Sequence, residues 1–438
     1  MGIALDARDR RILALAVPAL GSLAIEPLYL IVDTAIVGHL GKTALGGLAV
    51  ASSVLGVAFW VFHFLLEGVT TQVAQRVGAR DSAGAGQVVV RAMTVALLIG
   101  TVVAVVLVLG TGPVVGLFGG AGAVRRAAVT YTRISALSPP FIFVSMVGMG
   151  YLRGVEDTKA TVPVILTANV LNVVLELALV GPLHQGIAGS AWGTVFAQAI
   201  AAGWFVSIVA RRLPGIRWRP TLVGARALVR IGGQLFVRTA LLITMFSFAT
   251  RVAARIGDAT LGAHQIAYQL FMFLALSTDA LAVAGQTLAG TLIGAGDRAE
   301  LHAVTRRITR MSLVVGAVLT VIVAALAPLV PRVFTSDRAV IHQATIALLF
   351  LAVMQIPGAL AFQWDGLLMG ADDFGYLAAA MGVTFVFCMP LLFAVQAHRG
   401  AGIALLWTVL VLMVGVRAAL SMWRGRTDAW MVGPAIAK

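Results

Sequence analysis

Long apolar segments separated by short polar connections run the whole length of the chain. A helix of about 20 apolar residues crosses the hydrocarbon of a bilayer, whereas a barrel strand needs about 10 alternating residues. The pattern therefore predicts an all-α integral membrane protein with twelve transmembrane helices. The expected segments are residues 12–38, 45–75, 88–111, 127–152, 160–181, 186–210, 229–256, 260–293, 304–330, 338–368, 375–397 and 401–423.

Composition agrees with this class and excludes several others. Of the 438 residues, 60% are hydrophobic and 11% are charged, whereas soluble domains carry about 25% charged residues. The single cysteine, Cys388, has no partner for an internal disulfide. The histidines show no ligand spacing, so we predict no metal site. Residues 1–11 mix acids and bases without a small-residue cleavage site, and we expect no removable signal peptide.

The placement of positive charge predicts orientation in the membrane. A net charge of +14 raises the question of nucleic acid, but Arg and Lys gather in alternate connections, as the positive-inside rule predicts for cytoplasmic loops. We therefore expect no nucleic-acid partner and both termini in the cytoplasm. The expected location, which the charge pattern does not itself specify, is a bacterial plasma (inner) membrane. The richest connection carries Arg211, Arg212, Arg217, Arg219, Arg226 and Arg230.

The two halves of the chain repeat, and adding 216 to a position of the first half gives its counterpart in the second. Gly41 corresponds to Gly257 and Gly154 to Gly370. Six helices per half is an even number, so the halves are parallel repeats, for which a substrate site near the midplane between two lobes is expected. We predict pseudo-symmetric six-helix lobes at 1–211 and 226–438, joined by a cytoplasmic linker at 212–225.

The repeat exposes one chemical asymmetry. Asp33 lies near the end of the first apolar segment, where a charge costs about 2.5–3.5 kcal/mol on insertion scales. Its repeat partner is Ala249, and Glu176 corresponds to Leu392. Both halves need similar packing, so acids present in only one half are poorly explained as scaffold. We interpret Asp33 as the centre of a proton or cation site.

Other polar residues of the first half extend this candidate site. Glu26 precedes Asp33 by two helical turns and is expected on the same face. The alternative for the amides and hydroxyls is ordinary hydrogen bonding between helices, and for Tyr131 an interfacial anchor. Interior prolines kink helices and sometimes act as hinges. The remaining candidates are Tyr131, Asn169, Asn172 and Thr194 for the cation site, and Pro18 and Pro27 for a hinge.

Five stretches, in this order and spacing, resemble the MATE (multidrug and toxic compound extrusion) family, most closely its DinF-like branch. The resemblance covers nearly the whole chain and implies a cation-coupled efflux transporter with two six-helix bundles in a V shape. It implies that Asp33 is the coupling carboxylate, with Asn172, Glu176, Tyr131 and Thr194 in its polar network. The family often has Asp where this chain has Glu176. The stretches are residues 32–41, 152–159, 172–176, 262–265 and 364–370.

The predicted function is proton-coupled antiport of lipophilic, cationic drugs or toxic metabolites. Neighbouring carboxylates titrate together, and a proton and a cationic substrate would compete for their charge. Met and aromatic side chains suit an adaptable cavity, although for any one of them ordinary bundle packing is the more frequent explanation. The candidate cavity residues are Trp60, Phe64, Met146, Met149, Gln198, Met245, Phe271, Asp279 and Asp365.

Three alternatives come from other classes. A Na⁺-coupled exporter of the same fold would use the oxygens of the same residues. A lipid-linked precursor flippase would need a strongly cationic cavity, for which Arg238 is one candidate. A membrane-embedded enzyme would need a clustered catalytic set, which the sequence lacks, so we predict no enzymatic activity. We expect no cofactor beyond the coupling ion, H⁺ or alternatively Na⁺, and a monomer whose partners are a small-molecule substrate and the lipid bilayer.

Overall fold

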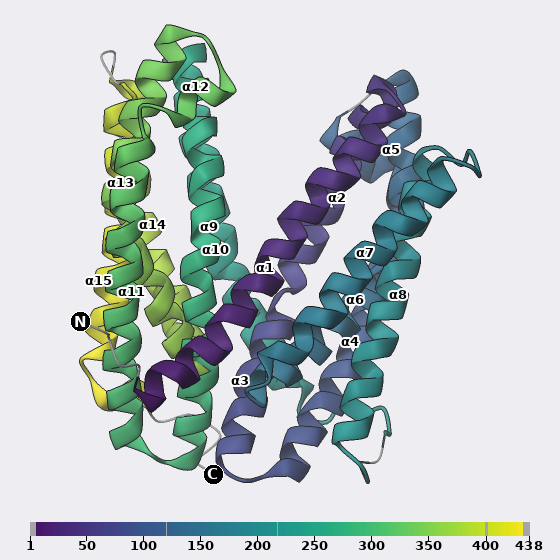
Figure 1. Cartoon of the computed structure of the whole chain (residues 1–438), viewed down its shortest axis with the longest axis vertical. Coiled ribbons are helices and arrows are strands. Elements are labelled where there is room, and N and C mark those ends of the chain that lie inside the picture. The colour runs from purple at the N-terminus through teal and green to yellow at the C-terminus, as the bar shows by residue number, and fades with distance from the viewer. Residues whose placement is uncertain (1–5, 120, 217, 399–401, 432–438) are drawn as a thin grey trace. The chain divides into compact units, whose positions relative to one another are not determined.

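The computed structural model describes residues 6–119, 121–216, 218–398 and 402–431, and within these ranges it contains helices and no strand (Figure 1). The first half comprises α1 (Ala7–His39), α2 (Lys42–Phe62), α3 (Phe64–Gly78), α4 (Ser82–Phe118), α5 (Gly122–Ser135), α6 (Pro139–Gly154), η1 (Thr158–Ala160), α7 (Thr161–Val180) and α8 (Ile187–Arg212). The second half comprises α9 (Ala225–Ile256), α10 (Asp258–Ala295), α11 (Arg298–Leu326), α12 (Val330–Phe334), α13 (Arg338–Gly370), α14 (Phe374–Ala397), α15 (Ile403–Gly425) and η2 (Asp428–Met431).

The predicted all-α membrane architecture is confirmed. Ten helices in the described ranges are long and apolar enough to cross a bilayer, and α5 and α6, bent by 52° at the break between them, are together long and apolar enough as well. The expected segment 45–75 is divided between α2, whose apolar part is Lys42–Val57, and α3. The expected segment 127–152 is divided between α5 and α6. Each of the twelve expected segments therefore corresponds to one helix or one interrupted pair.

Helix starts confirm the internal repeat. Five helices, or interrupted pairs, of the first half begin at positions that differ from those of their counterparts by the same 216, for example 258 − 42 for α10 and α2. The connections repeat as well, because Glu156 and Asp372 both have positive φ, 62° and 61°. The five pairs of first residues are Lys42 and Asp258, Ser82 and Arg298, Gly122 and Arg338, Thr158 and Phe374, and Ile187 and Ile403.

The corresponding helices α4 and α11 of the two halves begin with the same type of cap, an aspartate side chain. Asp81 precedes α4, and its carboxylate accepts a hydrogen bond from the Gly84 N–H (2.8 Å). Its repeat partner Asp297 caps α11 by accepting from the Glu300 N–H (2.9 Å). Such caps satisfy backbone donors that have no partner within the helix. The Gly84 N–H and then the Arg76 guanidinium hold the pKa of Asp81 below its ordinary value.

The halves differ where α5 and α6 correspond to the single helix α13. Residues 122–154 plus 216 give 338–370, the bounds of α13. Pro139 and Pro140 begin α6, and neither has a backbone N–H with which to continue the hydrogen bonds of a preceding helix. Their repeat partners are Gln355 and Ile356, which allow the helix to continue. The bend is therefore specific to the first half.

Glycines allow the closest helix contacts in both halves. A Cβ on Gly150 of α6 would lie 2.8 Å from the Leu66 carbonyl oxygen of α3. The repeat partner Gly366 in α13 meets the backbone of Ala282 in α10, and 282 is 66 plus 216. Small residues at such positions let helix backbones approach each other within a bilayer.

Two compact units are present, and their boundaries cut through helices. One unit is Val17–Gly232, and the other combines the described residues of Met1–Ala16 with those of Gly233–Lys438. The divisions fall within α1 and within α9, at positions related by the repeat (233 − 17 = 216). The lobes expected from the sequence, 1–211 and 226–438 around the linker 212–225, assign all of α1 to the first half. In the structure, the first turns of α1 belong to the unit that contains the second half.

Candidate functional site

Asp33 lies in the last two turns of α1 and is only 4% exposed. Two hydroxyl groups donate to its Oδ1 atom: Ser190 from α8 at 3.1 Å and Tyr29 from α1 at 3.3 Å. Tyr29 precedes Asp33 by four residues, so both side chains lie on one face of the helix. The carboxylate is therefore held between its own helix and α8.

The amide of Asn172 on α7 extends the same network. Its Nδ2 donates to the Tyr29 hydroxyl at 2.7 Å and contacts the Thr194 hydroxyl of α8 at 3.4 Å. Close approach of α7 and α8 depends on Gly193, where a Cβ would lie 3.2 Å from both Asn172 Oδ1 and the backbone N of Glu176. Asn172, Thr194 and Tyr29 thus connect three helices.

Glu176 is fully buried on α7 and interacts electrostatically with Asp33. Neither carboxyl oxygen of Glu176 accepts a hydrogen bond from the described residues, and neither does Asn172 Oδ1. Buried polar atoms are normally partnered, so three oxygens here are available to a proton or a cation. Tyr131 on α5 is buried and interacts electrostatically with both carboxylates. We call Tyr29, Asp33, Tyr131, Asn172, Glu176, Ser190 and Thr194 the Asp33 cluster.

Two residues predicted for the cation site, Glu26 and Asn169, and one predicted for the cavity, Gln198, are not part of this cluster. Glu26 is exposed although it shares the helical face of Asp33. Asn169 donates to the Ile165 carbonyl oxygen of its own helix (2.8 Å), and Gln198 is half-buried. Pro18 and Pro27 lie inside α1, which continues through both, so their hinge role stays a prediction.

Sequence reasoning missed Tyr29 and Ser190. Both carried a signal, since each lies one helical turn before a predicted member, Tyr29 before Asp33 and Ser190 before Thr194. In the second half, Leu406 stands where the first half has Ser190. The carboxylate and its hydroxyl donor are therefore both specific to the first half.

A separate ionic cluster occupies the second half. Asp365 of α13 is 3% exposed and bonds to the guanidinium groups of Arg238 (α9) and Arg417 (α15). Arg417 also lies over the Phe362 ring, 5.1 Å from its centroid. Asp279 interacts electrostatically with Arg238. Because two guanidinium groups bind Asp365, its charge is already neutralised, which weakens the argument for it as a cation-binding residue.

The Met and aromatic residues predicted to line a cavity differ in how deeply their side chains are buried. Met245 and Phe271 are buried in the core of the second half, and Phe64 is buried in the first. These contacts fit bundle packing. Met146 and Met149 on α6 are half-buried. The side chain of Trp60 lies outside the described residues. The role of all of them in a cavity stays a prediction.

Comparison with known proteins gives consistent results. A family model described as MatE matches the chain twice, over residues 18–177 and 235–394. The starts of the two matches differ by 217 in the numbering (235 − 18), close to the repeat of 216. Protein DETOXIFICATION 44, chloroplastic, of Arabidopsis thaliana is 31% identical over 435 residues, covering 96% of this chain and 83% of the relative.

Two further similarities cover almost the whole chain. DNA damage-inducible protein F of Escherichia coli (strain K12) is 27% identical over 441 residues, covering 97% of this chain and 95% of the relative. A solved structure described as a crystal structure of MATE in the bent conformation superimposes with a TM-score of 0.88 at 19% identity, covering 97% and 96% of the two chains. At that identity, the likeness supports the fold alone.

Proposed function

Because this chain belongs to the MatE family of multidrug and toxin extrusion transporters, we propose that it is a proton-coupled antiporter that exports lipophilic cations by alternating access. Membership confirms the predicted family, and it makes the chain a multi-pass membrane transporter and not an enzyme. The choice of ion and substrate is our proposal. The observation that carries it is the buried pair formed by Asp33 and Glu176.

The chemistry of this pair supports proton exchange. Tyr29 and Ser190 both donate to Asp33 Oδ1, and hydrogen bonds to a carboxylate favour its charged form. No hydrogen bond of ordinary geometry reaches the oxygens of Glu176 from the described residues, although Ser190 and Asp33 both interact with this carboxyl group. We therefore assign the transported proton to Glu176, shared with Asp33, and the pair titrates as a unit. A cationic substrate would compete for the remaining negative charge.

Energetics set a limit on this exchange. One pH unit supplies about 1.4 kcal/mol per proton, and 100 mV supplies about 2.3 kcal/mol per net charge moved. Exchange of one proton for one monovalent cation moves no net charge. Such a cycle would respond to the pH gradient and not to the membrane potential, which flux measurements under imposed potentials can establish.

A Na⁺-coupled cycle is the second candidate, and one observation favours it. The carboxylate oxygens of Glu176 and the amide oxygen of Asn172 have no hydrogen-bond partner among the described residues, and oxygens of these kinds suit a hard cation. Efflux of ethidium, used as a probe, from vesicles under separately imposed pH and sodium gradients distinguishes the two. Proton coupling requires efflux driven by the pH gradient in sodium-free buffer.

We also propose a bacterial plasma membrane, cytoplasmic termini and a monomeric state. The relative from Escherichia coli supports a bacterial membrane. The Arg-rich connection before α9 supports the orientation. Accessibility of a tag placed after residue 438 to added protease, in intact cells and in everted vesicles, tests the position of the C-terminus.

Substitution of Glu176 by glutamine tests the proton assignment. The amide preserves the shape of the side chain but binds no transportable proton, so we expect pH-driven ethidium efflux to fall at least tenfold. Asn169→Ala is the control on the same helix, because the Asn169 amide bonds to its own backbone. Efflux by the two variants within twofold of each other would contradict the assignment.

Ser190→Ala tests the hydroxyl that connects α8 to Asp33. A hydrogen bond to a charged group contributes about 1.5–3 kcal/mol, equivalent to about a tenfold or larger effect on the population of charged Asp33. We expect the pH midpoint of efflux to move, while Ser190→Thr, which keeps the hydroxyl, preserves the wild-type midpoint. Identical pH profiles for wild type and Ser190→Ala would remove Ser190 from the site.

A further inference from the structure

The first turns of α1 are buried in the unit that contains the second half. Ile12, Leu15 and Ala16 are 0%, 2% and 5% exposed and belong to one core cluster with residues of α10, α11 and α13, among them Leu281 and Ile308. Beyond Ala16, the helix belongs to the other unit, where it carries Asp33. One continuous helix therefore has its beginning in one unit and its ionisable site in the other.

The first turns of α9 show the reciprocal arrangement. They belong to the unit Val17–Gly232, and Leu228 and Ile231 are each 1% exposed. Both contact the position of Gly68 in α3, at 3.5 Å and 3.4 Å from a Cβ built there. Leu228 and Ile231 are the repeat partners of Ile12 and Leu15. In each half, therefore, the first turns of the first helix belong to the unit that contains the other half.

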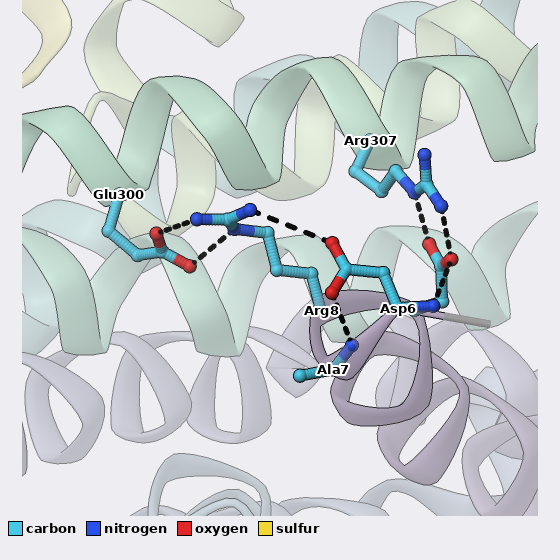
Figure 2. A network of polar contacts seen from close by, with 6 residues as sticks. Asp6, Ala7, Arg8, Glu300 and Arg307 are labelled. Carbon is cyan, nitrogen blue, oxygen red and sulfur yellow. Dashed lines mark hydrogen bonds and ion pairs between the residues drawn. The ribbon is translucent and has the colours of Figure 1, made fainter. Parts of the chain in front are cut away.

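A network of ion pairs connects the first turns of α1 to α11 (Figure 2). Arg8 donates from Nε and Nη2 to the two carboxylate oxygens of Glu300 on α11, at 2.9 and 2.8 Å. Asp9, only 2% exposed, accepts both hydrogen bonds of the Arg307 guanidinium. Asp6 bridges the pairs, because its backbone N–H donates to Asp9 at 3.1 Å and its carboxylate lies 3.6 Å from Arg8. Bidentate pairs of this kind fix geometry as well as charge.

The pseudo-symmetric positions cannot form these two ion pairs. Gly224 and Ala225 stand where α1 has its arginine and aspartate, and Gly84 stands where α11 has its glutamate. Only Arg307 keeps a charged counterpart, Arg91, whose guanidinium carbon lies 2.8 Å from a Cβ built on Gly224. The two ion pairs of α1 therefore have no equivalent at the pseudo-symmetric positions of α9, although the apolar contacts of the first turns are common to both helices.

We propose that Arg8, Asp9, Glu300 and Arg307 form a latch that keeps the first turns of α1 on α11 while the two halves rearrange during transport. This inference rests on the proposed antiport cycle. With residues 7–16 held in place, any relative movement of the halves must be absorbed by α1 between Ala16 and Asp33. Pro18 and Pro27 lie within that interval, and interior prolines weaken a helix locally. The latch thus keeps the beginning of α1 in a fixed position on α11 throughout the cycle.

Charge exchange tests the latch in the full-length protein. We expect Arg307→Asp to lower pH-driven ethidium efflux about tenfold or more at equal protein amount, and the double variant Asp9→Arg/Arg307→Asp to recover to within about threefold of wild type. Arg306→Asp is the matched control, because the neighbouring Arg306 donates to the His302 carbonyl of its own helix. If Arg307→Asp does not fold, the more exposed pair supplies the same comparison through Arg8→Glu and Arg8→Glu/Glu300→Arg.

Hydrogen–deuterium exchange separates the latch from the proposed transport function. Amides of residues 7–16 should exchange at least tenfold faster in Arg307→Asp than in wild type. The double variant Asp9→Arg/Arg307→Asp should restore the wild-type protection of these amides. Unchanged protection would show that these ion pairs do not hold α1, and lost protection with wild-type efflux would show that holding α1 is irrelevant to transport. Either result overturns the latch. Failure of wild-type protein to exchange ethidium for protons would instead refute the antiport proposal.

Discussion

Asp33→Asn should abolish proton-driven efflux, lowering its rate at least a hundredfold. Asparagine keeps the size of the side chain and an oxygen that accepts from Ser190 and Tyr29, but it carries no charge for a proton or a cation to bind. The measurement is ethidium efflux in proteoliposomes with an imposed pH gradient. Ethidium binding measured at equilibrium shows whether the cationic substrate uses the same charge.

The control for this variant is an acid of the other half. Asp258 lies exposed in the first turn of α10, so Asp258→Asn removes one negative charge without touching the Asp33 cluster, and we expect efflux within twofold of wild type. Equal efflux by the Asp33→Asn and wild-type proteins would refute the mechanism. A pH-independent but otherwise active Asp33→Asn variant would assign Asp33 to coupling alone.

The chemical core of the site was predictable because of the repeat. Packing requirements are shared by the halves, so Asp33 opposite Ala249 and Glu176 opposite Leu392 mark chemistry that one half has and the other lacks. Tyr29 and Ser190 were not identified in this way. A hydroxyl group costs little inside a membrane helix and is common there, so only the observed contacts distinguish these two.

Glu26 shows the limit of helical periodicity. Two helical turns separate it from Asp33, and the two share a face, yet Asp33 is buried and Glu26 is exposed. Periodicity fixes the direction of a side chain but not how far a neighbouring helix extends along that face. The helices that form the network around Asp33 are α7 and α8, which lie far from α1 in the sequence, and no local pattern specifies where their contact with α1 ends.

Hydropathy likewise did not predict that the first turns of α1 and α9 each belong to the unit that contains the other half. An apolar segment predicts a span, and Ile12 or Leu228 satisfies that pattern whichever bundle it packs into. The interruption between α5 and α6 did have a local signal in Pro139 and Pro140. Hydropathy alone concealed it, because the segment stays apolar on both sides of the bend. The apolar segments therefore predicted that each helix exists, but not which distant helices it contacts.

Gly150→Leu should strongly destabilise the fold. A Cβ at this position would lie 2.8 Å from the Leu66 carbonyl oxygen and 3.0 Å from Val69 Cβ, and leucine adds three further carbons. Overpacking costs about 1–3 kcal/mol, and about 2–4 °C of melting midpoint accompanies each kcal/mol in larger domains. We expect the midpoint in detergent to fall by about 6 °C or more, measured by size exclusion after heating.

The matched control is Gly203→Ala in α8, where nothing lies within 4 Å of the added Cβ. Alanine is favoured over glycine inside a helix by about 1 kcal/mol, so this variant should keep or raise the midpoint. Gly366→Leu, at the pseudo-symmetric contact, should lower the midpoint at least as much as Gly150→Leu, since a Cβ there would lie even closer to a backbone carbonyl oxygen, that of Ala282. A wild-type midpoint in either leucine variant would show that α3 with α6, or α10 with α13, can separate at little cost, and close glycine contacts would then not be what fixes the two halves.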